Sequence, residues 1–466
     1  MMTGDLKETR TDSVIRAIKG RIGSRALVEG DRLPSIRSLA STLGVSPSTV
    51  VSAYDLMAAE GLIKARPGSG FYVSGQALPP LTLTQASTPQ ARAIDPFWVS
   101  RLSLDAEPDM PKPGCGWLPA DWMPNDAMRR ALRHAARSGD ELLSFYGSTK
   151  GSVTLRRLLL ARLAEEGLEA EPDNLMLTNT GTQALDLVCR FLLRPGDVVV
   201  VDDPCYFNFQ AMLKVHQVRL VSVPYTPSGP DTAAFEALLA AERPKLYLTN
   251  TGLHNPTGAT PSPQSLHRLL SSAARHDLTI VEDDIFADFE PEPSSRLATF
   301  DGLQRVIRIG SFSKTLSASV RCGYIAAKSN WIEGLVDLQV ATNFGGPSPL
   351  AAELLSEILS GGSYRKHMED LRRKLARARR DVTERLSRLD IEPWIQPRGG
   401  FYLWCRLPGN LDSGRVAQAA LAEGLVLAPG NVFSSAQTAT NFMRFNVGFM
   451  MDQTIYDRLS KAMAAA

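Results

Sequence analysis

Strand-like and helix-like segments alternate regularly through residues 117–466 of the chain. Short β-rich runs such as "DVVVVDDP", "KLYLTNT", "LTIVEDD" and "RVIRIGS" are separated by stretches with helical character, for example "SPQSLHRLLSSAARH". The segment between the last two runs is too long for a hairpin. Because neighbouring parallel strands need long crossovers, usually helices, this alternation predicts an α/β fold with a mainly parallel sheet.

Polar motifs follow the β-rich runs, each directly after its run ends. In chain order they are "TGTQAL", "DDPCYF", "HNPTG", "EDDIF" and "SFSK". Ligands of parallel α/β sheets bind at the carboxyl ends of the strands, so we expect these motifs to meet in one site. A glycine and hydroxyl turn that opens a helix suits a phosphate group. An acid near a strand end suits a protonated ring nitrogen.

Lys314 stands alone among small and hydroxylated residues in "GSFSKTLSASVRCGY". A lysine that loses its proton easily suits imine formation with a carbonyl compound. By itself this motif would fit an ordinary exposed lysine equally well. The ordered set of motifs around it favours a ligand site.

Taken together, the motifs resemble fold-type I pyridoxal-phosphate enzymes of the aspartate aminotransferase superfamily, over roughly residues 120–460. The resemblance implies pyridoxal 5'-phosphate as the cofactor, held by Lys314 as an internal aldimine. It assigns further cofactor contacts, with Thr182 and Gln183 in the phosphate turn, Ser311 and Arg321 in the rest of the phosphate cup, Tyr206 stacked on the ring, Asn255 donating to the ring hydroxyl, and Asp283 holding the ring nitrogen protonated.

Two further residues follow from the same resemblance. Arg444, in "FMRFNVG", matches the arginine that clamps a substrate carboxylate, with a pairing to a core carboxylate as the alternative. Tyr146, in "LLSFYGSTKG", resembles the residue that reaches the phosphate of a partner subunit, which predicts a homodimer. We expect Asp284 to be a neighbour rather than the ring acid, and His254 to be a structural loop residue.

Phe286 departs from the family pattern. Fold-type I enzymes usually carry a tyrosine three residues after the ring acid, and its hydroxyl donates to the ring oxygen of the cofactor. In "EDDIF" that position is Phe286, which cannot donate a hydrogen bond. The bound cofactor should therefore stay protonated over a wider pH range, which fits a sensor better than a fast transaminase.

Residues 1–73 predict a separate winged helix-turn-helix domain. Ser35 can cap a short helix, "IRSLASTL", that ends at Gly44, and Ser46 can cap a second helix with Pro47 at its first position. β-prone runs around "PGSG" then predict a hairpin. The second helix has an apolar face formed by Val50, Tyr54 and Met57.

This head resembles the GntR family of bacterial regulators through "RLPSIRSLASTLGVS" and "EGLI…GSGFYV". The resemblance assigns contacts with double-stranded DNA to Arg37, Ser48, Thr49 and Gly68. Pro47 and Val51 stand where many family members carry basic residues, so less of the sequence readout can be assigned to charged side chains. A winged helix used for protein contacts is the alternative.

Charge and composition agree with this division. Residues 1–73 hold ten Lys and Arg against seven Asp and Glu, a net charge of +3, whereas the remainder holds 41 against 42, a net charge of −1.

A hydrophobic fraction of 44% and a charged fraction of 21% are typical of a globular protein, and no apolar run is long enough for a membrane span. No secretory signal opens the chain, and its cysteines are scattered without a zinc-type pair. We expect a cytoplasmic protein without a metal site.

Residues 74–116, rich in Pro, Ser, Thr and Ala, predict a linker between the head and a body at 117–466. Head and body together resemble the MocR subfamily of GntR regulators. This resemblance implies a regulator that senses an amine, an amino acid or the cofactor itself. A functional aminotransferase acting on an amino acid and a 2-oxo acid, with a regulatory head, is the main alternative. A DNA-binding protein with an unoccupied body is a third.

Overall fold

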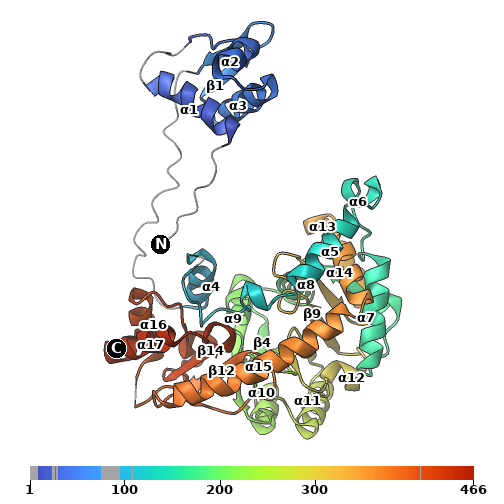
Figure 1. Ribbon diagram of the computed structural model, residues 1–466. Coiled ribbons are helices and arrows are strands. Elements are labelled where there is room, and N and C mark those ends of the chain that lie inside the picture. The colour runs from blue at the N-terminus through green and yellow to red at the C-terminus, as the bar shows by residue number, and fades with distance from the viewer. Residues whose placement is uncertain (1–8, 24–26, 28–29, 75–94, 108, 410) are drawn as a thin grey trace. The chain divides into compact units, whose positions relative to one another are not determined.

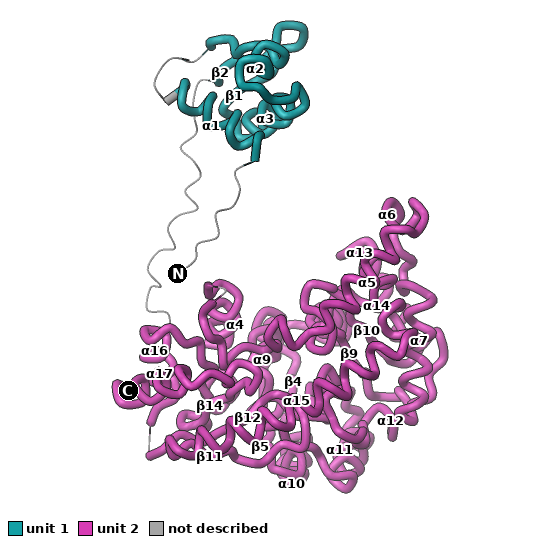
Figure 2. The backbone as a smooth tube through the Cα atoms, viewed as in Figure 1, with its two compact units in different colours: residues 1–92 teal, residues 93–466 magenta. Residues whose placement is uncertain are grey.

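The computed structural model describes residues 9–23, 27, 30–74, 95–107, 109–409 and 411–466. The chain forms two compact units, residues 1–92 and 93–466 (Figure 2).

The first unit is a small helical domain with a β-hairpin. Its elements are α1 (Arg10–Gly23), α2 (Ile36–Leu43), α3 (Pro47–Ala59), β1 (Ile63–Arg66) and β2 (Gly70–Val73), with β1 and β2 antiparallel. Ser35 and Ser46 cap α2 and α3, because each side-chain oxygen accepts a backbone N–H three residues later. Gly44 ends α2 in the left-handed conformation at φ 63°. The predicted helix-turn-helix and hairpin are confirmed.

The core of this unit lies between its three helices and the hairpin. The predicted apolar face of α3 is confirmed, since Val50, Tyr54 and Met57 are all buried. The Tyr54 hydroxyl donates to the Pro34 carbonyl oxygen at 2.8 Å, which fixes the chain just before α2. α1 packs against α3 and was not anticipated from the sequence.

The second unit is built on an eight-stranded sheet in the order β3-β10-β9-β8-β7-β4-β5-β6 (Figure 1). β10 is antiparallel to its two neighbours, β6 is antiparallel to β5, and the remaining pairs from β9 to β5 are parallel. The strands are β3 (Leu175–Thr178), β4 (Val198–Asp203), β5 (Arg219–Thr226), β6 (Gly229–Pro230), β7 (Leu246–Thr249), β8 (Thr279–Asp283), β9 (Val306–Ser311) and β10 (Gly323–Ala326). The predicted mainly parallel α/β sheet is confirmed.

Both faces of this sheet are buried. Along β4, Val199 and Val201 belong to one hydrophobic cluster and Val200 belongs to another, as expected when side chains alternate between two covered faces. The covering and flanking helices are α5 (Asn125–Ala135), α6 (Asp140–Ser144), α7 (Val153–Glu165), α8 (Gly181–Leu192), α9 (Phe207–Val215), α10 (Thr232–Glu242), α11 (Pro263–Arg275), α12 (Leu297–Asp301), α13 (Ser329–Asn343) and α14 (Pro349–Ser360). Short 3-10 turns lie at Ala120–Trp122, Pro172–Asn174 and Ala287–Phe289.

A smaller antiparallel sheet, in the order β11-β12-β14-β13, forms the C-terminal part of the second unit. The long helix α15 (Ser363–Ser387) leads into it from the larger part (Figure 1). Its elements are β11 (Glu392–Pro393), β12 (Tyr402–Arg406), α16 (Ser413–Ala422), β13 (Ala428–Pro429), the turn η4 (Gly430–Phe433), β14 (Phe442–Asn446), the turn η5 (Val447–Phe449) and α17 (Gln453–Ala464).

The segment that precedes the large sheet is folded rather than extended. Helix α4 (Pro96–Asp105) is capped by Asp95 and packs against α9 and η4. After it, Gly114 N–H donates to the Val426 carbonyl and Val426 N–H donates to the Pro111 carbonyl, which ties this stretch to the small sheet. The predicted linker at 74–116 therefore extends too far, because the second unit begins at residue 93.

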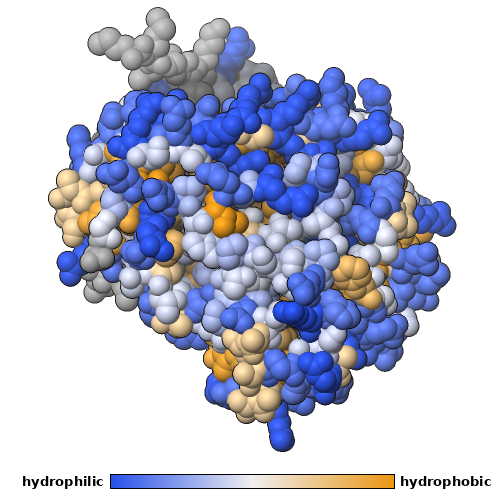
Figure 3. Space-filling view, turned by 90° about the horizontal axis from the view of Figure 1, so that it is seen from below, coloured by the Kyte–Doolittle hydropathy of each residue, from blue (hydrophilic) through white to orange (hydrophobic). Residues whose placement is uncertain are grey.

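On the face shown in Figure 3, hydrophobic residues occur in small groups among hydrophilic ones. Over the part of the chain that the structure describes, no helix is long and apolar enough to cross a membrane.

Candidate functional site

A cavity of about 250 Å³ lies where the predicted motifs converge, at the carboxyl ends of the parallel strands. Of the residues predicted to bind the cofactor, those on its wall are Thr182, Tyr206, Asn255, Asp283, Lys314 and Arg321. They come from separate segments of the chain between residues 182 and 321. The cavity also has walls that the sequence did not predict, formed by α4, by Trp117 and by Tyr402.

Lys314 lies on this cavity wall in the loop after β9. Burial lowers the pKa of its amine to about 8, and the positive charges of Arg444 and Arg321 act in the same direction. Gly116 lies beside it, and a Cβ at Gly116 would meet the Lys314 Nζ at 3.6 Å, an ordinary contact distance. An amine with this pKa is partly neutral near pH 7 and can act as a nucleophile.

Asp283 ends β8 and faces the same cavity. Burial raises the pKa of its carboxyl to about 7, although a hydrogen bond from the Ile285 N–H opposes this rise. Asn250 stabilises the end of β8, because its Nδ2 donates a hydrogen bond to the Asp283 carbonyl oxygen at 2.9 Å. The Asn250 Oδ1 is buried without a hydrogen-bond partner among the described residues. A cationic ring nitrogen bound here would stabilise the Asp283 carboxylate.

One end of the cavity suits an anion. α8 begins at Gly181, so the N–H groups of its first turn point out of the helix, and Thr180 caps it. Arg321 is exposed on the wall and has no ion pair with any carboxylate that the structure describes. Gly323 permits the closeness of the two segments, because a Cβ there would lie 2.8 Å from the Gly181 nitrogen. Gly323 was not singled out from the sequence.

Two predicted phosphate residues lie behind this wall rather than on it. The Gln183 side-chain oxygen accepts the Asn179 N–H at 2.7 Å, which holds the turn before α8. The Ser311 hydroxyl donates to the Cys322 carbonyl oxygen at 3.2 Å. Both residues therefore support the backbone of the anion-binding end in this structure.

Arg444 is fully buried in β14 and does not line the cavity. Its Nη1 donates to the Asn255 Oδ1 at 2.9 Å, and its Nη2 donates to the Gly114 carbonyl at 2.7 Å. The Tyr402 ring covers the guanidinium, with 4.1 Å between the Arg444 Cζ and the ring centroid. The structure thus brings Arg444 beside Asn255, and both Nη atoms donate to uncharged oxygens rather than to a core carboxylate. Its role as a carboxylate clamp stays a prediction.

Phe286 also lines the cavity, three residues after Asp283. It is buried against Phe289, Phe401 and Tyr402, with ring centroids 5.6–6.3 Å apart. An apolar ring therefore occupies the position where the family usually has a hydroxyl donor. His254 lies away from the cavity, stacked on Tyr225 at 3.7 Å, as expected for a structural residue.

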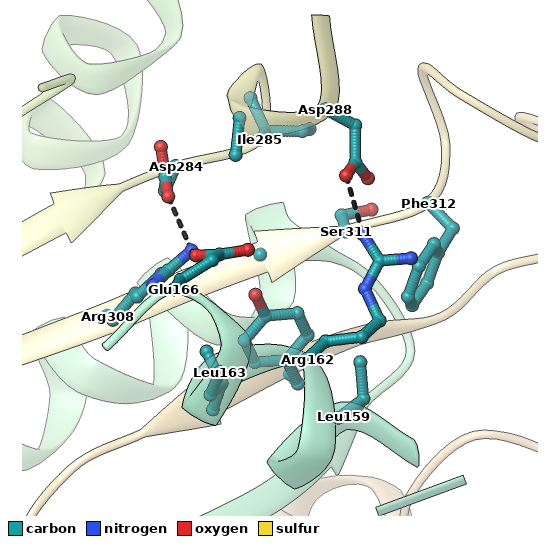
Figure 4. A pocket seen from close by; sticks show the side chains of 13 residues that line it. Leu159, Arg162, Leu163, Glu166, Asp284, Ile285, Asp288, Arg308, Ser311 and Phe312 are labelled. Carbon is teal, nitrogen blue, oxygen red and sulfur yellow. Dashed lines mark hydrogen bonds and ion pairs between the residues drawn. The ribbon is translucent and has the colours of Figure 1, made fainter. Parts of the chain in front are cut away.

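Asp284, the neighbour of the predicted ring acid, points into a separate buried network (Figure 4). Arg296 Nε donates to both of its carboxylate oxygens at 2.8 Å, and the Arg308 Nη2 lies 2.7 Å from the Asp284 Oδ2. Arg308 also pairs with Glu166. This network fixes the end of β8 and leaves Asp283 as the acid that faces the cavity.

Tyr146 is 81% exposed and does not reach the cavity of its own chain. Its ring packs edge-on against Phe344, at 5.0 Å between centroids, and Phe344 is itself 69% exposed. Leu143 and Phe145, two neighbours in the same segment, are each 66% exposed. These four residues form an exposed apolar group, called here the 143–146/344 group.

The predicted DNA-contact residues all lie in the first unit. Arg37, Ser48 and Gly68 are exposed, and Thr49 is half-buried. Ser46 bonds to the hydroxyls of Ser48 and Thr49 at 2.8 Å, which orients both at the start of α3. Exposed cations that sequence reasoning missed are Arg32, Lys64 and Arg66 in and beside the hairpin. A count of positive charge along the hairpin could have found them.

The residues on the cavity wall fit pyridoxal 5'-phosphate. The α8 start and Arg321 suit its phosphate, Asp283 suits its ring nitrogen, and Lys314 suits its aldehyde carbon. The buried Asn250 Oδ1 on this wall has no hydrogen-bond partner among the described residues, so a polar group of a ligand can pair with it. The fold and the site together define a fold-type I pyridoxal-phosphate protein that carries a winged helix.

The chain belongs to the aminotransferase class I and II family, whose model matches residues 119–462. Residues 10–73 match the model for bacterial regulatory proteins of the gntR family. This combination confirms the expected MocR-type architecture and pyridoxal 5'-phosphate as the cofactor.

Relatives over the whole length carry regulator names. The chain is 29% identical over 442 residues to the uncharacterized HTH-type transcriptional regulator YdcR of Escherichia coli K12, and the match covers 93% of each chain. It is 26% identical over 444 residues to the HTH-type transcriptional regulator NorG of Staphylococcus aureus USA300, covering 92% of this chain and 98% of NorG.

Two solved structures that are similar to this chain are aminotransferases. The kynurenine aminotransferase of Pyrococcus horikoshii superposes with a TM-score of 0.72 at 25% identity, covering 80% of this chain and 95% of that chain. The α-aminoadipate aminotransferase LysN of Thermus thermophilus superposes with a TM-score of 0.70 at 25% identity, covering 78% of this chain and 94% of that chain.

Proposed function

We propose that this protein is a DNA-binding transcription regulator whose body uses pyridoxal 5'-phosphate to sense a small amine or amino acid. The observation that carries the proposal is the presence in one chain of a winged helix and of Lys314, with its lowered pKa, beside Asp283 and Arg321. An effector changes DNA binding only if it binds two arrangements of the protein with different affinity.

Each residue of the body has a distinct part in ligand binding. When bound, the cofactor supplies an aldehyde carbon that condenses reversibly with amines. With a pKa of about 8, the Lys314 amine is neutral in roughly a tenth of the molecules at pH 7. Arg321 and the start of α8 hold the phosphate, while Asp283 holds the ring nitrogen in its protonated form. Asn255, oriented by Arg444, donates to the ring oxygen.

The head contacts double-stranded DNA through α3 and the hairpin. The N–H groups at the start of α3, with Ser48 and Thr49, suit phosphate oxygens, and Arg37 lies exposed on α2. Gly68 has φ 70° at the hairpin turn, a conformation that favours glycine and lets the turn approach the DNA backbone. Binding should weaken steeply with salt.

The protein acts as a homodimer in the cytoplasm, where its head can reach DNA. The 143–146/344 group supports the dimer, because exposed aromatic residues side by side mark interaction surfaces. It includes Tyr146, which would reach the phosphate in the partner subunit.

A working aminotransferase with a regulatory head is the second candidate. The cofactor residues on the cavity wall favour it, whereas Phe286 and the enclosed Arg444 favour a sensor. An enzyme releases new 2-oxo acid over many turnovers with an amino donor and acceptor. A sensor stops at binding or after one half-reaction, and a body without cofactor shows no absorbance in the visible region.

The test is Lys314→Ala in the full chain, with Lys214→Ala on the exposed surface of α9 as the matched control. We expect borohydride to trap the cofactor covalently in the wild type and in the control, and not in Lys314→Ala. DNA binding should persist in Lys314→Ala, while its response to amines is lost. Covalent trapping in Lys314→Ala would show that another residue holds the cofactor.

A further inference from the structure

The exposed face of helix α3 in the head has no positive charge. α3 packs against α1, α2 and β1 with the side that holds Val50, Tyr54 and Met57, and its other side is exposed. The exposed residues of α3 are Pro47, Ser48, Val51, Ser52, Asp55, Leu56 and Ala59. Its whole sequence, "PSTVVSAYDLMAA", contains no Arg, Lys, Asn or Gln. α3 therefore lacks the side chains that pair with guanine or adenine through two hydrogen bonds.

The cations of the head lie on the elements beside α3. Arg37 is exposed on α2, and Lys64 and Arg66 are exposed on β1. These side chains suit the phosphates that border a groove of DNA. Asp55 on α3 is exposed and forms no ion pair with any residue that the structure describes. Because a carboxylate repels phosphate, this part of α3 suits the base edges in the groove better than the DNA backbone.

Val51 is the first large apolar residue on the exposed face of α3. Its side chain is 38% exposed, and it follows Ser48 by three residues on the same side of the helix. At 1.5 Å per residue, it lies about 4.5 Å further along the helix axis than Ser48. With the first turn of α3 at a phosphate, Val51 reaches the depth of the bases. Its methyl groups form no hydrogen bonds, and the apolar group that the major groove presents is the C5-methyl of thymine.

From these observations we infer that Val51 recognises a thymine in the major groove, through contact between its methyl groups and the C5-methyl of that base. Selection of DNA at this position depends on an apolar contact, in place of the hydrogen bonds that a cation would donate to guanine. This inference rests on the proposed function, because it names a base that the DNA-binding head recognises in double-stranded DNA.

The experiment uses the full-length, cofactor-loaded protein to select duplexes from a random library. In a selected duplex, each thymine is replaced in turn by deoxyuridine, which still pairs with adenine but lacks the C5-methyl group. Fluorescence anisotropy at constant salt gives the dissociation constants for wild type, Val51→Ser and Leu56→Ser. Leu56 is a matched control because it is also an exposed apolar residue of α3, at 49%, but lies five residues nearer the end of the helix.

We expect one thymine whose replacement weakens wild-type binding about fourfold, as burial of one methyl group provides. Val51→Ser should bind the thymine and deoxyuridine duplexes equally, whereas Leu56→Ser should keep the fourfold preference. The dependence of affinity on salt should be the same in Val51→Ser and in the wild type, since no phosphate contact is removed.

An unchanged thymine preference in Val51→Ser would overturn the inference. Loss of the preference in Leu56→Ser, alone or together with Val51→Ser, would do the same, because the contact would then not be specific to Val51. Failure of the wild type to select any duplex would refute the proposed function and this inference with it. Tight binding of a selected duplex in which no thymine is sensitive to replacement would refute recognition by Val51 alone and leave the proposed function intact.

Discussion

The two units of this protein place their functional residues in opposite ways. In the head, the predicted DNA contacts lie within 32 positions of one another, from Arg37 to Gly68, and most are exposed. In the body, the residues that line the cavity are far apart in the sequence, from α4 near the start of the unit to Tyr402 in the small sheet. Local sequence is thus enough to form the first site, whereas the second exists only when the whole unit is folded.

The largest expected effect concerns what the body adds to the head. Residues 1–75 alone should bind DNA about 10²–10⁴-fold more weakly than the full chain, because the dimeric body that we propose would hold two heads at high effective concentration. The measurement is a DNA titration at constant salt. Equal affinity of the isolated head and the full chain would contradict the dimer.

A second prediction separates the stabilities of the two units. Asp284→Ala removes a carboxylate that two buried cations share, Arg296 and Arg308, and should destabilise the body by about 3–5 kcal/mol even though Glu290 and Glu166 remain beside them. The head should keep its own unfolding transition, since its core is separate. Glu384→Ala, which removes an exposed pair with Arg388, should cost less than about 1 kcal/mol. Chemical denaturation followed by circular dichroism measures both, and similar losses in the two variants would show that the Asp284 network does not hold the body.

A third prediction tests the exposed contacts of the head. Arg37→Ala should weaken DNA binding about five- to tenfold and lower the magnitude of the salt slope by about one, as expected for loss of a phosphate contact. Lys19→Ala is the control, because Lys19 pairs with Glu60 on the same unit. Unchanged affinity and slope in Arg37→Ala would place the contact elsewhere.

The smallest effect is expected at Phe286. In Phe286→Tyr, a new hydroxyl would donate to the ring oxygen and stabilise the deprotonated form of the bound cofactor. The pKa read from cofactor absorbance should therefore fall by about half to one unit, at 1.36 kcal/mol per unit. An unchanged or higher pKa would show that Phe286 does not stand at the donor position, and would remove one reason to favour sensing over transamination.

Much of the body's site was predictable because its chemistry follows strand ends. Asp283 and Asp284 were distinguished in advance, and the structure gives a physical reason, since only Asp283 faces the cavity. The role of α4 was not predictable. Its residues lie in a Pro-rich stretch that indicates a linker, and the helix gains its place only by packing on α9 and η4.

The sequence by itself determined the elements that depend on neighbouring residues. Serine caps, Gly44, the hairpin turn and the alternating strands all follow from local preferences. The motif order indicated the cofactor and predicts Lys314 as the residue that holds it. Tertiary structure alone decided which side chains share a cavity. In the folded chain, the Tyr402 ring covers Arg444, and Ser103 lies on the wall of the cavity. Gln183 and Ser311 lie behind the end of the cavity that suits an anion. The physical reason is that the burial and the hydrogen-bond partners of a side chain depend on residues far apart in the chain, which local sequence patterns do not specify.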